Sequence, residues 1–143
     1  MCRKAYDEVY LDFMIQKTRY LFKLIARSDA EAFSVIESYM CCDYRKYMDN
    51  GNPLYLNKTP KQILSSIGIQ CQHDMEISEE YDEFIMEWIA DIYTYMQWNY
   101  NLSSKEIVKK IKPNELYRKF NPLHEMSIKN AVERLVEMHQ INI

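Results

Sequence analysis

Glycine is almost absent from this chain: two of its 143 residues are glycines, Gly51 and Gly68, and they stand far apart. Domains rich in β-turns use glycine and proline wherever a turn needs a positive or a fixed φ. Phosphate-binding loops need several glycines close together. Since the chain also has only four prolines, its sequence argues against β-sandwich, Rossmann and P-loop folds and favours a helical one.

Apolar residues recur every three or four positions, which is the spacing of amphipathic helices. The first predicted helix carries its apolar stripe on Tyr6, Val9, Tyr10, Phe13, Tyr20, Leu21, Leu24 and Ile25. A second helix is predicted to begin at a capping box, Ser28 with Glu31, and to continue through Tyr47. It ends before Gly51, because glycine tolerates the left-handed conformation of a helix C-terminus.

Caps and helix breakers predict further helices over residues 60–67, 78–100, 104–111, 113–120 and 127–138. Thr59, Ser103 and Ser127 are the expected N-caps of three of them. The fold prediction is therefore all-α, a compact bundle of six or seven helices with one long central helix near residues 79–100. We expect a single helical domain over residues 1–143. The alternative division has subdomains 1–68 and 78–143 with a connector at 69–77.

Four acidic residues follow one another at intervals of four along the predicted central helix: Glu79, Glu83, Glu87 and Asp91. Like charges four apart share a helix face and cost roughly 0.2–0.5 kcal/mol per pair. A basic surface is therefore expected to meet this row. Either the chain supplies it, for example from Lys109, Lys110 or Arg118, or a basic partner protein docks there.

The same helix ends in a group of aromatic residues. Because Tyr93 and Tyr95 are two positions apart, they cannot lie on one helix face. At least one of Tyr95 and Trp98 is therefore expected to point away from the main core. Aromatic side chains of this kind are typical anchors of protein interfaces. The predicted docking surface is the acidic row with Tyr95 or Trp98 as its anchor.

A second candidate surface is basic and lies on the short predicted helices that follow: Lys105, Lys109, Lys110, Lys112, Arg118 and Lys119. The segment NLSSKEIVKKI resembles the second helix of a helix-turn-helix motif. However, the next segment is short and begins with Pro113, a poor match to a recognition helix. The formal net charge of −3 also argues against a general nucleic-acid binder. A DNA-binding regulator is the alternative function.

Cysteine and histidine residues do not follow the spacing of a zinc site. The candidates for a catalytic or metal-binding role are Cys71 with His73 and the adjacent Cys41 and Cys42. Nucleophilic pairs meet in space rather than in sequence, so a small enzyme with a cysteine or histidine nucleophile is the third class. No catalytic signature is present, and no metal or cofactor is expected. With no apolar run near the roughly 20 residues of a membrane span and no secretory leader, a cytoplasmic location is expected.

The C-terminal half resembles a known group of proteins. The segment EEYDEFIMEWIADIYTYMQWNYNLSSKEIVKKI, followed by PLHEMSIKNAVERL, is similar to small bacterial all-α proteins associated with toxin–antitoxin or phage-defence gene neighbourhoods. The similarity covers about residues 78–136 and includes no catalytic motif. It implies a cognate protein partner. The expected function is a non-enzymatic, antitoxin- or inhibitor-type module that binds a basic protein, and a homodimer is left open.

Overall fold

The computed structural model describes residues 3–28, 30–51, 58–69 and 80–142, and this part of the chain is helical without a strand. A 3₁₀ turn, η1 (Glu8–Tyr10), precedes eight α-helices: α1 (Leu11–Arg27), α2 (Ala32–Cys41), α3 (Asp43–Asp49), α4 (Pro60–Ser66), α5 (Glu83–Tyr100), α6 (Ser104–Lys110), α7 (Pro113–Leu123) and α8 (Ile128–Met138). The all-α prediction is confirmed. None of the described helices is long and apolar enough to cross a membrane.

The extra helix comes from a break that the sequence did not predict. At Cys42 the backbone is extended, with φ −78° and ψ 160°, and the thiol accepts a hydrogen bond from the amide of Arg45. The predicted second helix is therefore two helices, α2 and α3. The predicted capping box at its start is also wrong. Ser28 ends α1 by donating its hydroxyl to the carbonyl of Ile25, and Glu31 caps α2.

The other predicted caps are confirmed, because Thr59, Ser103 and Ser127 each accept a backbone N–H with their hydroxyl oxygens. The central helix α5 begins at a different residue from the predicted Ser78, since its N-cap is Asp82. Its end at Asn101 has a left-handed φ of 52°. Most of the predicted connector, together with residues 78 and 79, lies outside the described residues.

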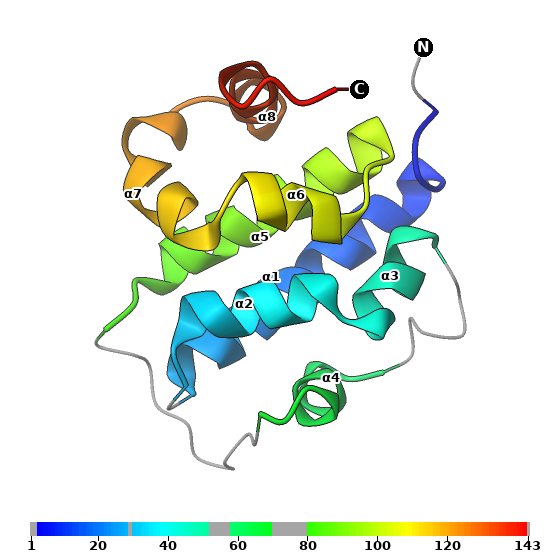
Figure 1. Ribbon diagram of the computed structural model, residues 1–143, viewed down its shortest axis with the longest axis vertical. Helices are drawn as coiled ribbons and strands as arrows, with labels where there is room; N and C mark the ends of the chain where they lie inside the picture. The colour runs from blue at the N-terminus through cyan, green and yellow to red at the C-terminus, as the bar shows by residue number, and fades with distance from the viewer. Residues whose placement is uncertain (1–2, 29, 52–57, 70–79, 143) are drawn as a thin grey trace.

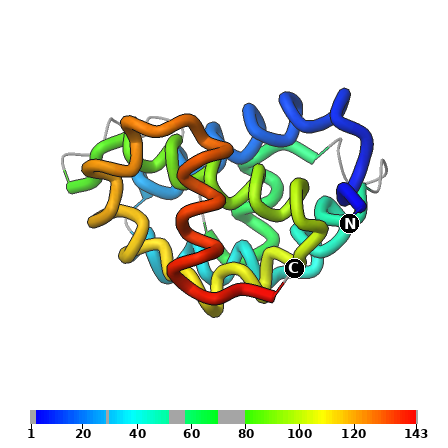
Figure 2. Tube along the Cα trace, turned by 90° about the horizontal axis from the view of Figure 1, so that it is seen from above, coloured from blue at the N-terminus to red at the C-terminus, as the bar shows by residue number. Residues whose placement is uncertain are grey.

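Helix α5 lies at the centre of the molecule and packs along α1 (Figure 1). It also contacts α6, α7 and α8, while α4 packs against α1. Helices α2 and α6 contact each other and lie on the same side of the α1–α5 pair in both views (Figures 1 and 2). The long pair is thus covered on several sides, and the interaction between α1 and α5 dominates the fold.

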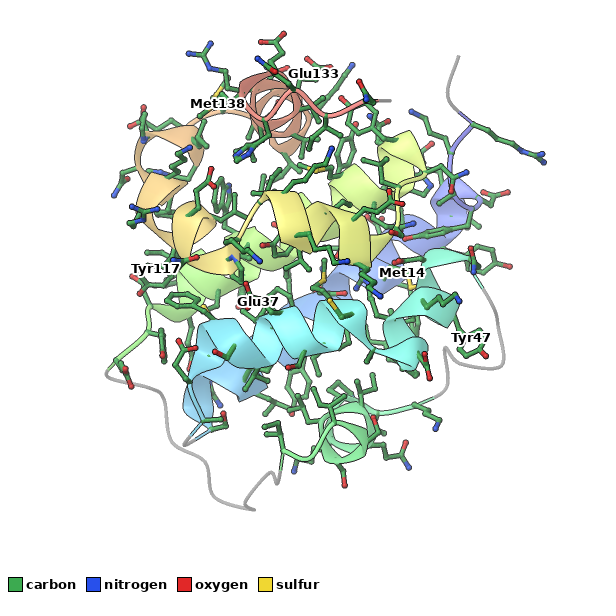
Figure 3. All side chains as sticks on the ribbon, in the orientation of Figure 1. Met14, Glu37, Tyr47, Tyr117, Glu133 and Met138 are labelled. Atoms are coloured by element: carbon green, nitrogen blue, oxygen red, sulfur yellow. The ribbon has the colours of Figure 1, made fainter. Side chains whose placement is uncertain are left out.

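One hydrophobic cluster runs through the bundle, from Met14 on α1 to Ile141 after α8. At its centre Phe22 packs edge-on against Tyr39 and Tyr93, with ring centroids 6.1 and 6.5 Å apart. Met14 points into this cluster (Figure 3). The cluster joins residues of both predicted halves of the chain.

Glu115 connects α7 to the end of α8. Its carboxylate oxygen Oε2 lies 2.6 Å from Nε2 of His139 and accepts a hydrogen bond of 2.7 Å from Lys119. Burial raises the pKa of Glu115, but the bonds from Lys119 and His139 outweigh burial and hold this pKa below its ordinary value. The negative charge of Glu115 therefore stabilises the contact between α7 and the residue that ends α8.

Glu115→Gln should lower the free energy of unfolding by about 1 kcal/mol at neutral pH, because the charge-assisted bonds are lost. The folded-state pKa lies below the unfolded value of about 4.3, so this contribution is present above that value and is lost as the pH falls through the folded pKa. Urea titrations of both proteins between neutral pH and about pH 3 measure it. The difference should shrink on acidification, and a difference that stays constant contradicts the assignment.

Candidate protein-interaction face

The acidic row on α5 is neutralised by basic residues of α1. Three ion pairs join the two helices, and we call them the α1–α5 ladder: Arg27 with Glu83, Lys23 with Glu87 and Arg19 with Asp91. The outer two pairs each contain two hydrogen bonds, of 2.7 and 2.8 Å for Glu83 and of 2.6 and 2.7 Å for Asp91. Burial raises the pKa of Asp91, and the bonds from Arg19 limit the rise.

The ladder corrects the predicted docking surface. Basic residues do meet Glu83, Glu87 and Asp91, but they belong to this chain and lie on α1 rather than on α6. Asp91 is buried and Glu83 and Glu87 are half-buried, whereas Glu79 lies outside the described residues. The electrostatic argument for a partner at this row is therefore removed.

Neither of the two predicted aromatic anchors, Tyr95 and Trp98, is fully exposed to solvent. Trp98 is only 5% exposed, and its indole N–H donates a hydrogen bond of 2.7 Å to the carbonyl of Tyr6. Tyr95 is half-buried against the core, with its ring centroid 5.8 Å from that of Trp98. Trp98 lies outside the main hydrophobic cluster. This agrees with the expectation that at least one of Tyr95 and Trp98 points away from the main core. The N-terminal segment, which the sequence placed in the first helix, covers Trp98.

The basic residues of the alternative surface lie on α6, at the N-cap of α7 and on α7 itself. Lys105, Lys109, Lys110, Lys112 and Arg118 are exposed, whereas Lys119 is half-buried beside Glu115. Lys112 also pairs with Glu37 of α2, at 3.2 Å. Helix α6 has seven residues, and α7 bends at Asn121, where ψ is 121°.

The candidate cysteine and histidine sites gain no support from the described residues. Cys41 is exposed, while Cys42 is half-buried at the cap of α3, where burial raises the pKa of its thiol. Cys71 and His73 lie outside the described residues. Among those that are described, no three histidine, cysteine or acidic side chains gather as metal ligands would.

Three apolar residues near the N-terminus, which the sequence analysis assigned to the core stripe of the first helix, are exposed in the structure. Val9 is 74% exposed, and Tyr10 and Phe13 are each 51% exposed. Val9 and Tyr10 belong to η1 and Phe13 to the first turn of α1, at the edge of the molecule (Figure 2). Three acids of the same segment are also exposed: Asp7, Glu8 and Asp12. We call these six residues the η1–α1 face.

Helix α1 is apolar on two sides, which explains the error. Its buried side carries Leu11 and Met14, while Phe13 on α1 and Val9 on the preceding η1 turn are exposed. The carboxylate of Asp7 accepts the amide of Val9 at 3.0 Å and so begins η1, in which no residue is buried. The sequence did carry a signal for an exposed apolar surface, because a helix that packs on one core needs apolar residues on one side only. Tyr20 and Tyr47, also expected in core stripes, are exposed as well.

An open pocket of about 730 Å³ lies beside this face. It is lined by residues 3–8 together with Asn50, Trp98 and Asn101. The backbone N–H of Ala5 donates to the carbonyl of Trp98 at 3.0 Å, which holds the N-terminal segment against the end of α5. Burial raises the pKa of Tyr6 in this segment to about 12, so its hydroxyl stays neutral.

Sequence reasoning also missed a buried polar cluster around Arg45, which is only 2% exposed. The guanidinium donates hydrogen bonds of 2.9 to 3.2 Å to four side chains, and together with it they form the Arg45 cluster: Thr18, Tyr39, Asp49 and Ser104. Burial alone would lower the pKa of Arg45, but Tyr39 and Asp49 outweigh burial and hold it above its ordinary value. The cluster connects α1, α2, α3 and α6 through one charged group.

Comparison with known proteins gives no match: no family model, no curated protein and no solved structure is similar to the chain. The function is therefore inferred from the side chains themselves. The ladder and the Arg45 cluster use their charges within the fold, whereas the η1–α1 face presents apolar and acidic groups to solvent.

Proposed function

We propose that the protein is a non-enzymatic interaction module that binds a basic partner protein through the η1–α1 face. The observation that carries this proposal is the exposure of Val9, Tyr10 and Phe13 together on a folded element. Contiguous apolar patches on a protein surface typically mark binding sites, and aromatic residues are enriched among interface hot spots. An antitoxin or inhibitor role rests on the resemblance of residues 78–136 described above.

The charges of the face favour a basic partner. Asp7, Glu8 and Asp12 are exposed, and none of them takes part in an ion pair within the described part of the chain. The Lys17 ammonium lies over the Phe13 ring, 5.6 Å from its centroid. Acidic groups around an apolar centre complement a basic segment with apolar side chains of its own.

The face is also fixed before binding. Met14, the residue after Phe13 on α1, is 1% exposed in the core, and the α1–α5 ladder ties the later turns of α1 to α5. A preorganised face loses little conformational entropy when a partner binds. The start of α1 can therefore serve as a rigid binding element.

Affinity purification followed by native mass spectrometry tests the proposal. The wild-type protein should retain one stoichiometric basic partner. Val9→Ser/Phe13→Ser should weaken that complex by at least about thirtyfold, the effect of losing a hot-spot residue of roughly 2 kcal/mol.

The matched control is Phe84→Ser. Phe84 is 80% exposed, but it lies at the opposite end of α5 from Trp98, about 20 Å away at the helical rise of 1.5 Å per residue. The control should retain the partner. Equal retention by the control and the double variant contradicts the proposed face.

DNA binding through α6 is the second candidate function. Lys105, Lys109 and Lys110 are exposed and form no ion pair among the described residues. A mobility-shift assay at physiological salt separates the two functions. Salt-sensitive binding to duplex DNA that is lost in Lys105→Ala/Lys109→Ala would favour the regulator.

A further inference from the structure

The N-terminal segment places a lysine in a site at the end of α5. The ammonium nitrogen of Lys4 lies 5.2 Å from the centroid of the Trp98 ring. The same nitrogen donates a hydrogen bond to Oδ1 of Asn99 and lies 3.4 Å from the carbonyl oxygen of Asn99. One ammonium group is therefore bound by an indole face and two oxygen acceptors.

The chemistry of this site selects a cation. The face of an indole ring attracts ammonium groups through its quadrupole. Asn99 belongs to the last turn of α5, where carbonyl oxygens lack helical partners and carry the negative end of the helix dipole. The carboxylates of Asp7 and Glu8 line the same pocket. Among the described residues, Arg3 is the one cation besides Lys4 that lines this pocket.

The segment stays in place without the Lys4 side chain. Two other contacts fix it to α5: the N–H of Ala5 to the carbonyl of Trp98, and the indole N–H of Trp98 to the carbonyl of Tyr6. Lys4 itself is exposed, and the pocket around it is open, with about 730 Å³ of space. A second lysine side chain therefore has room to reach the site and replace the first.

We propose that the Trp98 ring and Asn99 form a lysine-binding site for the basic partner, which the chain's own Lys4 occupies in the free protein. The inference rests on the proposed function for the identity of its ligand, a lysine side chain of the partner. It also assigns a role to Trp98, as the receptor for a charged group beneath the N-terminal segment. Lys4 competes with the partner and sets the affinity of the site.

The site can be tested without the partner. The chain has two tryptophans, so Trp88→Phe leaves Trp98 as the single tryptophan, whose emission is followed with selective tryptophan excitation. In this background, Nα-acetyl-lysine methylamide, which keeps its charged ε-ammonium group, is titrated into the protein with Lys4 and into the Lys4→Ala protein. The Lys4→Ala protein should bind at least about tenfold more tightly, since its site is vacant. Adding Asn99→Ala to Lys4→Ala should abolish this gain.

The uncharged probe N-acetyl-norleucine methylamide is the control ligand. It should leave the Trp98 fluorescence unchanged in both proteins, and circular dichroism should show the same helix content in all variants. The proposal fails if Lys4→Ala binds the lysine probe no better than the protein with Lys4, or if both probes bind equally. Such a failure leaves the η1–α1 face untouched, because that face is tested by Val9→Ser/Phe13→Ser with the partner itself.

Discussion

Replacing Arg45 with leucine is expected to lower the free energy of unfolding by about 3–5 kcal/mol, the cost of leaving a buried charge without its partner. Arg45 is 2% exposed, and its removal leaves the carboxylate of Asp49 with the hydrogen bonds from Ser104 as its remaining ones among the described residues. The hydroxyls of Thr18 and Tyr39 lose a charged donor at the same time. Urea unfolding at neutral pH measures the change.

The neighbouring residue supplies the matched control. Lys46 is exposed on the same short helix, and Lys46→Leu should change stability by less than about 0.5 kcal/mol. The double variant Arg45→Leu/Asp49→Leu should recover part of the loss, because apolar replacement of a whole buried pair is often tolerated. Should Arg45→Leu fail to fold, Asp49→Asn provides a milder measurement. A loss below about 1 kcal/mol for Arg45→Leu would show that the cluster contributes little.

Reversing the charge of Asp91 is expected to cost about 3 kcal/mol, because Asp91→Arg puts two guanidinium groups together at a buried position. Asp91 has a side chain only 10% exposed and accepts two bonds from Arg19. Glu87→Arg is the contrast: its pair with Lys23 is longer, at 3.3 Å, and more exposed. That change should cost less than about 1 kcal/mol.

The charge swap Arg19→Asp/Asp91→Arg then tests the pairing itself. It should restore at least half of the stability lost by Asp91→Arg, as measured in a double-mutant cycle. If the acids of α5 served a partner instead, reversal would leave folding nearly unchanged. An Asp91→Arg protein as stable as the wild type would therefore contradict the α1–α5 ladder.

Local signals in the sequence predicted local structure well. The caps Thr59, Ser103 and Ser127 bond to backbone groups a few residues away, so their neighbours decide the outcome. The break at Cys42 was missed because cysteine is an uncommon cap. The all-α class of the fold followed from the scarcity of glycine and proline together with the apolar periodicity, whereas the number of helices depended on this one position.

Long-range pairing was harder to predict, although one signal was present. Arg19, Lys23 and Arg27 are spaced four apart, like the acids of α5, so two matching rows existed in the sequence. The Arg45 cluster gave no comparable signal, because an arginine four residues before an aspartate is common on exposed helix faces. Its burial depends on Thr18 and Ser104, which are distant in sequence.

The η1–α1 face was misassigned for a related reason. Periodicity shows that Val9 and Phe13 share a side of the helix, and that Leu11 and Met14 share another. Which side is buried is decided by α5, which packs against the second. Only the assembled bundle separates an apolar side that forms core from one that faces solvent.

Amide hydrogen exchange of the protein, alone and with the captured partner, tests the central claim most directly. No residue of the η1 turn is buried, and exposed end turns open at little free-energy cost, so the amides of residues 8–13 should exchange faster than those of α5 in the free protein. Partner binding should slow exchange over residues 8–13 and leave α6 unchanged. Protection confined to α6, with residues 8–13 exchanging as in the free protein, would contradict the proposed face.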